Sequence, residues 1–247
     1  MASYDYKAGK KRINDILNSK LEVLERNKLP SDDNFTFDNG YYSWVSSIFV
    51  DIRDSSTLFV DDDKVKVSKI IRSFTSEVIE ILRSGNYLRE IGIRGDCVYG
   101  IYTTPKVSNI YDLVDKTWYV NTYVKMLNRL LQNKEYPTIS VGIGMSTAQE
   151  LVIKAGRKDV GINSKVWIGE AVTKASILSS LGNKNGISPL VYSSCSYSNF
   201  IDALVEGNGE EVKDWFTYKY DLSYGTYYHA NIIKPDFNKW ISEGMKD

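Results

Sequence analysis

Apolar residues recur every three or four positions in two long stretches of the chain, residues 64–83 and 107–132. This spacing predicts two amphipathic helices, because residues three and four apart share one face of a helix. Short runs rich in aromatic and β-branched residues predict strands around these helices. The predicted strands cover residues 41–52, 87–94, 97–103 and 137–145.

The order strand, helix, hairpin, helix, strand is typical of a ferredoxin-like βαββαβ core. It predicts an α+β fold in which helices cover one face of an antiparallel sheet. Residues 148–155 fit either a short helix or an extended segment, and 169–181 fit a further helix. A helix near 197–204 and two aromatic strands, 215–220 and 225–233, predict a β-rich C-terminal extension.

The N-terminal segment predicts a helix over residues 7–29, ended near Pro30, and then a polar linker over 31–40. This helix would either pack on its own domain or reach a second subunit. No composition shift divides the rest of the chain. We therefore expect an N-terminal helix and linker in residues 1–40 and one domain, with its extension, in 41–247.

Composition excludes several kinds of function. The 31 basic residues balance the 31 acidic ones, so no net charge favours nucleic acid or anionic lipid. No apolar run approaches the roughly 18 residues of a membrane span, and no signal peptide is recognisable, so we expect a cytoplasmic protein. Two distant cysteines, Cys97 and Cys195, and one histidine, His229, argue against a disulfide framework or zinc site.

Candidate chemistry therefore depends on carboxylates. Asp51 ends a buried strand, and Asp96 follows Gly95 at the expected tip of a hairpin. Carboxylates on neighbouring strand ends suit a pair of hard divalent cations, Mg²⁺ or Mn²⁺, which can act on both oxygens of a phosphoryl displacement. Taken singly, each aspartate is also a common capping or turn residue.

Neighbouring residues add possible substrate contacts. Phe49 shares a strand face with Asp51 and would stack on a base or pack in the core. Arg94 would contact a phosphate or keep the carboxylates ionised. The segment Ser55, Ser56 and Thr57 lies at a strand-to-helix junction, where it would offer backbone amides to phosphate oxygens or cap the helix.

These residues resemble the class III nucleotidyl cyclases over residues 42–192. Residues 49–53, FVDIR, are similar to the family's F-x-D-I strand end, and residues 95–99, GDCVY, are similar to its G-D hairpin. Residues 141–146, VGIGMS, and 168–178, IGEAVTKASIL, resemble the later strand and helix motifs in degraded form.

The resemblance implies two Mn²⁺ or Mg²⁺ ions per site, held by the carboxylates of Asp51 and Asp96 and the carbonyl of Ile52. It also implies cyclisation of a nucleoside triphosphate to its 3′,5′-cyclic monophosphate and pyrophosphate. Family members act as dimers, with the metals of one subunit facing the base pocket of the other.

The chain departs from the family pattern at four positions. The family's ribose- and phosphate-binding asparagine and arginine fall on Thr173 and Ile177, its adenine-reading lysine on Gly92, and its partner aspartate on or near Val166. We therefore expect no ordinary adenine recognition. The candidates to replace the missing arginine are Arg94 and Lys174.

Metal aspartates combined with altered base-reading positions are similar to the bacterial Pycsar pyrimidine cyclases of antiphage defence. This implies a uridylate cyclase acting on UTP, or a cytidylate cyclase acting on CTP, whose cyclic product is sensed by a separate effector protein. A catalytically weakened dimerisation or ligand-sensing module remains an alternative. An adenylate, guanylate or diguanylate cyclase fits these residues less well.

Overall fold

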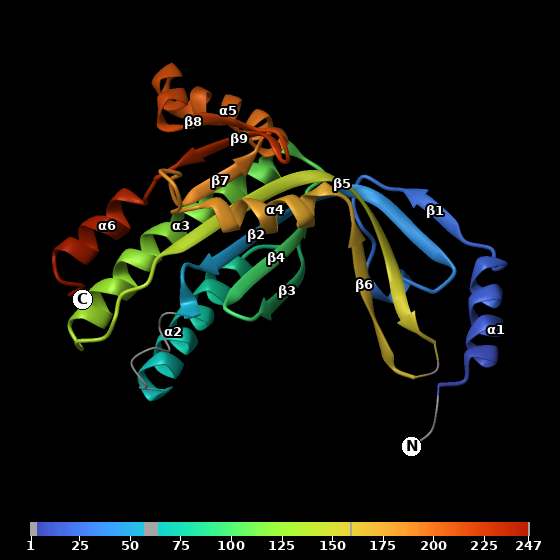
Figure 1. Ribbon diagram of the computed structural model, residues 1–247. Helices are drawn as coiled ribbons and strands as arrows, with labels where there is room; N and C mark the ends of the chain where they lie inside the picture. The colour runs from blue at the N-terminus through green and yellow to red at the C-terminus, as the bar shows by residue number, and fades with distance from the viewer. Residues whose placement is uncertain (1–3, 57–63, 159, 247) are drawn as a thin grey trace.

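The computed structural model describes residues 4–56, 64–158 and 160–246. Within these ranges, nine strands form one sheet in the order β3-β4-β2-β5-β7-β9-β8, with β1 paired to β2 and β6 paired to β5 (Figure 1). The strands are β1 Glu22–Glu25, β2 Asn39–Ile52, β3 Leu88–Arg94, β4 Cys97–Thr103, β5 Val141–Arg157, β6 Ile162–Ile168, β7 Leu190–Ser193, β8 Thr217–Asp221 and β9 Gly225–Ala230.

Helices cover both faces of this sheet, so the expectation of one covered face is wrong. Helices α2, α3 and α5 pack on one face, and α4 packs on the other. The reason is the pair of glycines on β5: a Cβ atom on Gly142 or Gly144 would lie 2.0–2.1 Å from backbone oxygens of α4. The helices are α1 Tyr6–Leu17, α2 Lys64–Arg83, α3 Val107–Gln132, α4 Glu170–Leu181, α5 Ser194–Asn208 and α6 Pro235–Ser242, with short 3-10 turns η1 Asp32–Asn34 and η3 Glu210–Trp215.

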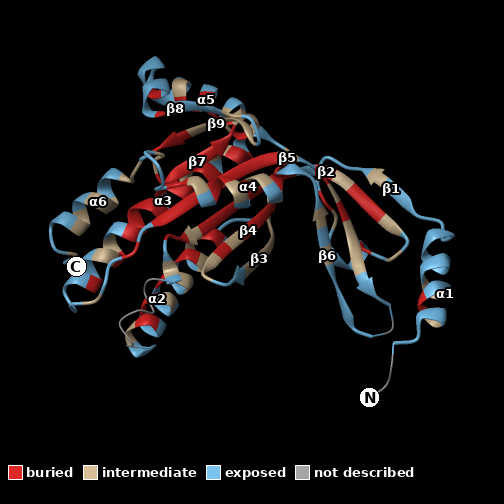
Figure 2. Cartoon of the chain, in the orientation of Figure 1, coloured by how far each residue is buried: buried red, intermediate tan, exposed pale blue. Residues whose placement is uncertain are grey.

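Strand β2 passes through the centre of the core, and its side chains alternate between the two faces. Ile48, Val50 and Ile52 join α2 and α3 in the main hydrophobic cluster. Phe49 and Asp51 therefore point to the face that carries α4. Figure 2 shows this burial as a red band through β2, β5 and β7.

The N-terminal helix is shorter than the periodicity predicts. It begins after Asp5, whose side chain accepts from Lys7 and Ala8, and ends at Leu17, where the hydroxyl of Ser19 bonds the carbonyl of Ile16. Residues 22–25 then form β1, which pairs in parallel with β2. The apolar spacing of residues 21–24 suits a helix, but pairing with the edge of β2 prevails.

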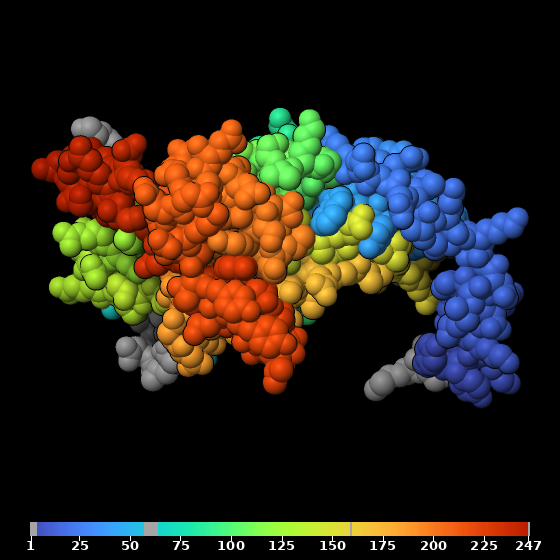
Figure 3. All heavy atoms as spheres, turned by 90° about the horizontal axis from the view of Figure 1, so that it is seen from above, coloured from blue at the N-terminus to red at the C-terminus, as the bar shows by residue number. Residues whose placement is uncertain are grey.

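The β5–β6 hairpin is one of the elements that the sequence pattern does not predict. Residues 148–155 continue β5 as far as Arg157, and β6 returns beside them. Both strands are largely exposed beyond Val152, in contrast to the core (Figure 2). Helix α1 projects from this end of the molecule and is seen in blue in Figure 3.

The C-terminal extension contains the predicted helix and strands, with shifted ends. Strand β9 stops at Ala230, and α6, which the sequence reading did not include, packs against α3. Among the helices of the described ranges, none combines the length and hydrophobicity that a membrane span requires.

Candidate active site

The two candidate carboxylates lie at the same end of the central strands. Asp51 pairs with Cys97 across β2 and β4, and Cys97 pairs with Arg94 across β4 and β3. Cross-strand partners share one side of a sheet, so these residues form a row. Asp96 adjoins it in the β3–β4 turn, where Gly95 has a φ of +65°. We call Asp51, Arg94, Asp96 and Cys97 the carboxylate row.

Opposing influences act on the carboxyl group of Asp51. Burial raises its pKa, the guanidinium of Arg53 lowers it, and the charge of Asp96 raises it, with a net rise above the ordinary value. Because Asp96 acts through its charge, the two carboxylates are close enough to repel each other.

Arg53 fixes the orientation of Asp51. Its almost fully buried side chain donates from Nη2 to the Asp51 carboxylate and from Nη1 to the carbonyl of Ser180 in α4, the latter over 2.8 Å. Sequence reasoning assigned Arg53 no role. The signal was present, because residues two apart at a strand end share a face.

The side chains of the carboxylate row are chemically suited to bind a divalent cation. Burial raises the pKa of the Cys97 thiol to about 12, and the charges of Asp51 and Asp96 add to the rise. Asp51 bonds the buried guanidinium of Arg53, and the exposed Lys184 is a further cation that acts on Asp51. Oxygen ligands of this kind suit Mg²⁺ and Mn²⁺. Within the described residues, no group of three His, Cys, Asp or Glu side chains forms a metal site, so backbone or substrate oxygens would complete the shell.

The next row of the same face holds two stacked rings. Phe49 is 9% exposed, and its ring stacks on Tyr99 with centroids 5.1 Å and planes 14° apart. The Tyr99 ring also lies over its cross-strand partner Gly92, where a Cβ atom would lie 2.6 Å from the Tyr99 hydroxyl oxygen. Tyr99 is thus the more exposed ring of the pair, and it fills the place where the family resemblance expects a lysine.

A chain of hydrogen bonds fixes Tyr99 to the β5–β6 hairpin. Its hydroxyl donates to Oε1 of Glu90 over 2.9 Å, and Nε1 of Trp167 donates to Oε2 of Glu90 over 2.8 Å. Burial, and then the bond to Glu90, raise the pKa of Tyr99, so the hydroxyl keeps its proton at neutral pH. Sequence reasoning missed all three residues, because a hydrogen-bond chain across strands leaves no spacing pattern.

The residues after β2 are placed in part. Ser55 is partly buried and Ser56 is exposed, in a short turn beside Asp54, whose φ is +50°. Thr57 lies outside the described residues. Phosphate binding by this segment therefore stays a prediction.

Lys174 lies away from the carboxylate row, on α4. With Thr173, Ile177 and residues 223–224 of the β8–β9 turn, it lines a pocket of about 210 Å³. Arg53, which bonds Asp51, contacts α4 at Ser180, six residues further along, a rise of about 9 Å in a helix. Lys174 is therefore displaced along α4 from the residue that Arg53 contacts.

A buried carboxylate holds the start of α4. Glu150 on β5 is fully buried, accepts the N–H of Ala171 and packs against Gly169, whose φ is +155°. Burial raises the pKa of Glu150, and its bonds to backbone N–H groups oppose the rise. Within the described residues, Glu150 Oε2 and the hydroxyl of its cross-strand partner Ser43 have no hydrogen-bond partner.

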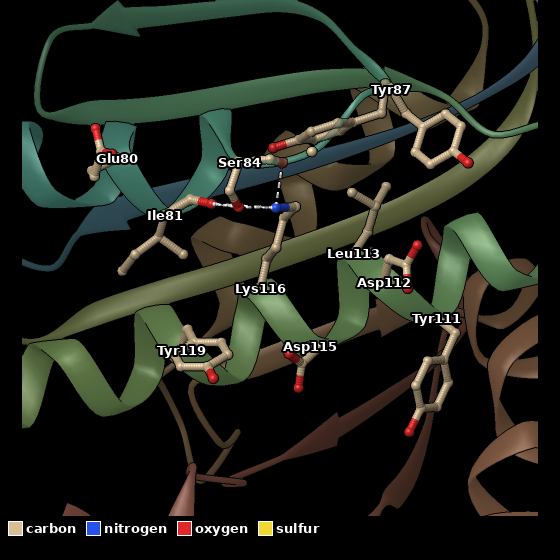
Figure 4. Close-up of a pocket in the computed structure, with 12 residues that line it drawn as sticks. Glu80, Ile81, Ser84, Tyr87, Tyr111, Asp112, Leu113, Asp115, Lys116 and Tyr119 are labelled. Atoms are coloured by element: carbon tan, nitrogen blue, oxygen red, sulfur yellow. Dashed lines mark hydrogen bonds between the residues drawn. The ribbon is translucent and has the colours of Figure 1, made fainter. Parts of the chain in front are cut away.

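A larger pocket, of about 550 Å³, lies between the end of α2 and helix α3 (Figure 4). Lys116 reaches across it and donates to the carbonyl of Ser84 over 2.5 Å, where it satisfies the C-terminal end of α2. Helices α2 and α3 cover the face opposite Asp51, so this pocket is separate from the carboxylate row.

Comparison with known proteins gives consistent results. No family model matches the chain. The chain is 55% identical over 244 residues to a uridylate cyclase from Treponema porcinum, covering 99% of this chain and 83% of that protein. It is 28% identical over 250 residues to a uridylate cyclase from Gulbenkiania mobilis, covering 98% and 97%. The solved adenylyl cyclase CyaB from P. aeruginosa matches with a TM-score of 0.61 at 16% identity, over 77% of this chain and 94% of that one.

The fold is that of a class III nucleotidyl cyclase domain, as the resemblance predicted. At 16% identity, the structural match establishes the fold alone. The identity of 55% over almost the whole chain goes further: the chain belongs to the uridylate cyclase family. The predicted α+β class and the predicted enzyme class, a nucleotide cyclase, are both confirmed.

Proposed function

We propose that this chain converts UTP to 3′,5′-cyclic UMP and pyrophosphate. The observation that carries this function is the 55% identity to a uridylate cyclase over 99% of the chain. In the reaction, the ribose 3′-oxygen forms a bond to the α-phosphorus and loses its proton. The bond from that phosphorus to the oxygen shared with the β-phosphorus breaks, and pyrophosphate leaves.

Asp51, Asp96 and the carbonyl of Ile52 would hold two Mg²⁺ or Mn²⁺ ions. The support is the pair of neighbouring carboxylates, which lie close enough for the charge of Asp96 to raise the pKa of Asp51. When bound, the ions supply Lewis acidity to the attacking and leaving oxygens. Arg53 keeps Asp51 in one orientation and ties it to α4, so the ligand geometry is set before substrate binds.

The remaining predicted residues have two proposed roles: some bind the triphosphate, and others stabilise the negative charge that develops on it during the reaction. Backbone amides of Ser55, Ser56 and Thr57 would bind phosphate oxygens at the end of β2. Arg94 in the carboxylate row and Lys174 on α4 are the proposed cations for the transferred phosphorus, in place of the family's arginine. Phe49 would support the base indirectly, through the ring of Tyr99 that stacks on it.

We further propose a homodimer in which the carboxylate row of one subunit faces α4 of the other. The separation of Lys174 from Ser180 along α4 supports this, because Lys174 is displaced from the Arg53–Asp51 pair of its own chain. Residues 41–247 would form the cyclase domain and residues 1–40 an accessory segment. The cyclic UMP would act in the cytoplasm on a separate effector protein, in antiphage defence.

The test is to incubate the purified chain with each of the four nucleoside triphosphates and Mn²⁺, and to separate the products by chromatography. We expect cyclic UMP and pyrophosphate from UTP. A product from CTP alone would make the chain a cytidylate cyclase. Binding of UTP without any cyclic product would favour the ligand-sensing module, which the replaced residues Thr173 and Ile177 allow.

A further inference from the structure

Tyr99 lies on the face that carries the carboxylate row, one step further along β4. It follows Cys97 by two residues, so about 7 Å separates their Cα atoms in an extended strand. Its ring is partly exposed, unlike that of Phe49. In the proposed homodimer, a nucleotide held by the carboxylate row of one subunit would meet the Tyr99 ring of the other, since this ring fills the place of the base-reading lysine.

The direction of the hydrogen bond between Tyr99 and Glu90 is fixed, with Tyr99 as the donor. A carboxylate accepts and does not donate, so the single hydroxyl proton of Tyr99 is committed to Oε1 of Glu90. The other oxygen, Oε2, already accepts from Trp167, which keeps the carboxylate in place. The phenol oxygen of Tyr99 therefore offers a ligand its lone pairs and no proton.

The position of this acceptor is also fixed. Phe49 supports the ring by stacking, and the absence of a side chain on Gly92 lets the ring lie across β3. An acceptor held in this way loses little entropy on binding, and it discriminates strongly against a partner that offers no donor.

We propose that Tyr99 selects the base of the substrate, by accepting a hydrogen bond from an N–H in its ring plane. Uracil presents such a donor at N3, whereas cytosine presents in-plane donors only at its exocyclic N4 amine. An acceptor fixed opposite N3 would therefore pair with uracil and would meet the N3 lone pair of neutral cytosine. Glu90 and Trp167 are positioning residues, since they act through the Tyr99 hydroxyl. This role rests on the proposed cyclase function and names the group that reads its base.

The first experiment compares Tyr99→Phe with the wild type, by kcat/KM for UTP and for CTP in Mn²⁺. Phenylalanine keeps the ring and its stacking on Phe49 but removes the acceptor. We expect kcat/KM for UTP to fall about tenfold, the value of one hydrogen bond, while that for CTP changes little. Tyr220→Phe, on the exposed strand β8, is the matched control and should leave both values unchanged.

The second experiment uses Glu90→Gln to reverse the polarity. A glutamine amide can donate to the Tyr99 oxygen, which frees the hydroxyl proton to bond an acceptor on the base. We expect the UTP-to-CTP ratio of kcat/KM to fall, with CTP gaining relative to UTP. A residue that only stabilises the fold would reduce both values together.

An unchanged UTP-to-CTP ratio in a folded Tyr99→Phe protein would overturn the base-selecting role, and so would equal losses with both substrates. Folding is checked by the thermal unfolding midpoint of each variant. These results differ from a failure of the proposed function, in which the wild type itself forms no cyclic product and both ideas fall together.

Discussion

The carboxylate row and the outer surface of α4 lie on the same side of the sheet, yet they are built differently. In the row, Asp51 sits at the end of a buried strand, and Arg53 fixes it from one side. On α4, Lys174 and Ile177 line a small pocket against the β8–β9 turn, and Thr173 is exposed. The two candidate metal carboxylates thus lie together within one chain, whereas the two candidate phosphate cations are divided: Arg94 belongs to the row and Lys174 lies apart from it.

Arg53 does not make up this difference. Its guanidinium is buried and already bonded to Asp51 and to the carbonyl of Ser180, so moving it to a phosphate would leave Asp51 unpaired. The comparison therefore indicates that metal binding and stabilisation of the transferred phosphate are separable here. Substitutions in the two regions should reduce activity in different ways and by different amounts.

The largest effect should come from the carboxylate row. Asp51→Asn or Asp96→Asn removes the charge of a proposed metal ligand while nearly keeping its shape. We expect the turnover of UTP to fall at least about a hundredfold, because several kcal/mol of charge stabilisation are lost and each 1.36 kcal/mol is tenfold in rate. Raising the Mn²⁺ concentration should restore only a small part of the rate.

The control for these variants is Asp202→Asn on α5, an exposed aspartate on the opposite face. Its turnover should equal that of the wild type. If Asp51→Asn and Asp96→Asn both kept more than a tenth of the wild-type rate, the metal site would lie elsewhere. Circular dichroism on each variant separates this result from loss of the fold.

The next largest effect should come from moving α4 away from the sheet. Gly144→Ala places a methyl group 2.1 Å from the carbonyl oxygen of Ala175, and the backbone must shift to accept it. We expect a loss of about 2–3 kcal/mol in the free energy of unfolding, as for overpacked cores, measured by urea denaturation. Activity should fall too, because Arg53 bonds α4.

Gly207→Ala is the matched control for this change. Gly207 lies in α5, and an added Cβ atom there meets nothing within 4 Å. Alanine should therefore stabilise the protein by about 0.5–1 kcal/mol through its helix propensity. A Gly144→Ala variant as stable as the wild type would mean that α4 does not pack as closely as described.

A smaller effect is expected on the outer surface of α4. Lys174→Gln removes the cation beside Thr173 and Ile177, the positions of the two missing family residues. We expect kcat for UTP to fall about tenfold with little change in KM, since the loss of a charge that stabilises only the transition state lowers kcat. Arg94→Gln is the comparison, and a larger loss there would assign the role to the carboxylate row.

The core elements could be predicted because their burial imposes a regular spacing. Helices α2 and α3 match residues 64–83 and 107–132, since their buried residues recur every three or four positions. The β5–β6 hairpin and β1 could not, because exposed strands bury little and leave no such pattern. The N-terminal helix shows the opposite error. Its helical spacing of apolar residues continues beyond the true end of the helix, into residues that pair with β2 as a strand.

The candidate site divides in the same way. Asp51 and Asp96 were identifiable because each ends a strand in a turn motif, and cross-strand register then brings them together. Tyr99, Glu90 and Trp167 come from three different strands, so their contact depends on tertiary register alone. Local spacing carries no information about such a contact.

The smallest effect concerns Glu150, which supports α4 from within the core. Burial raises the pKa of Glu150 above its ordinary value, so the folded protein holds the proton more tightly than the unfolded chain. The contribution of the Glu150 proton to the free energy of unfolding is therefore complete below about pH 4.5, and it is lost as the pH rises through the pKa of the folded protein.

The variant Glu150→Gln tests this contribution, because it keeps an oxygen acceptor for the N–H of Ala171 and removes the titrating carboxyl group. The wild type should accordingly be most stable relative to the variant at low pH, and this advantage in the free energy of unfolding should shrink as the pH rises above about 4.5. Urea unfolding at a series of pH values measures it. A difference that stays constant, or grows with pH, would mean that the Glu150 carboxylate is better stabilised by the start of α4 than it is penalised by burial.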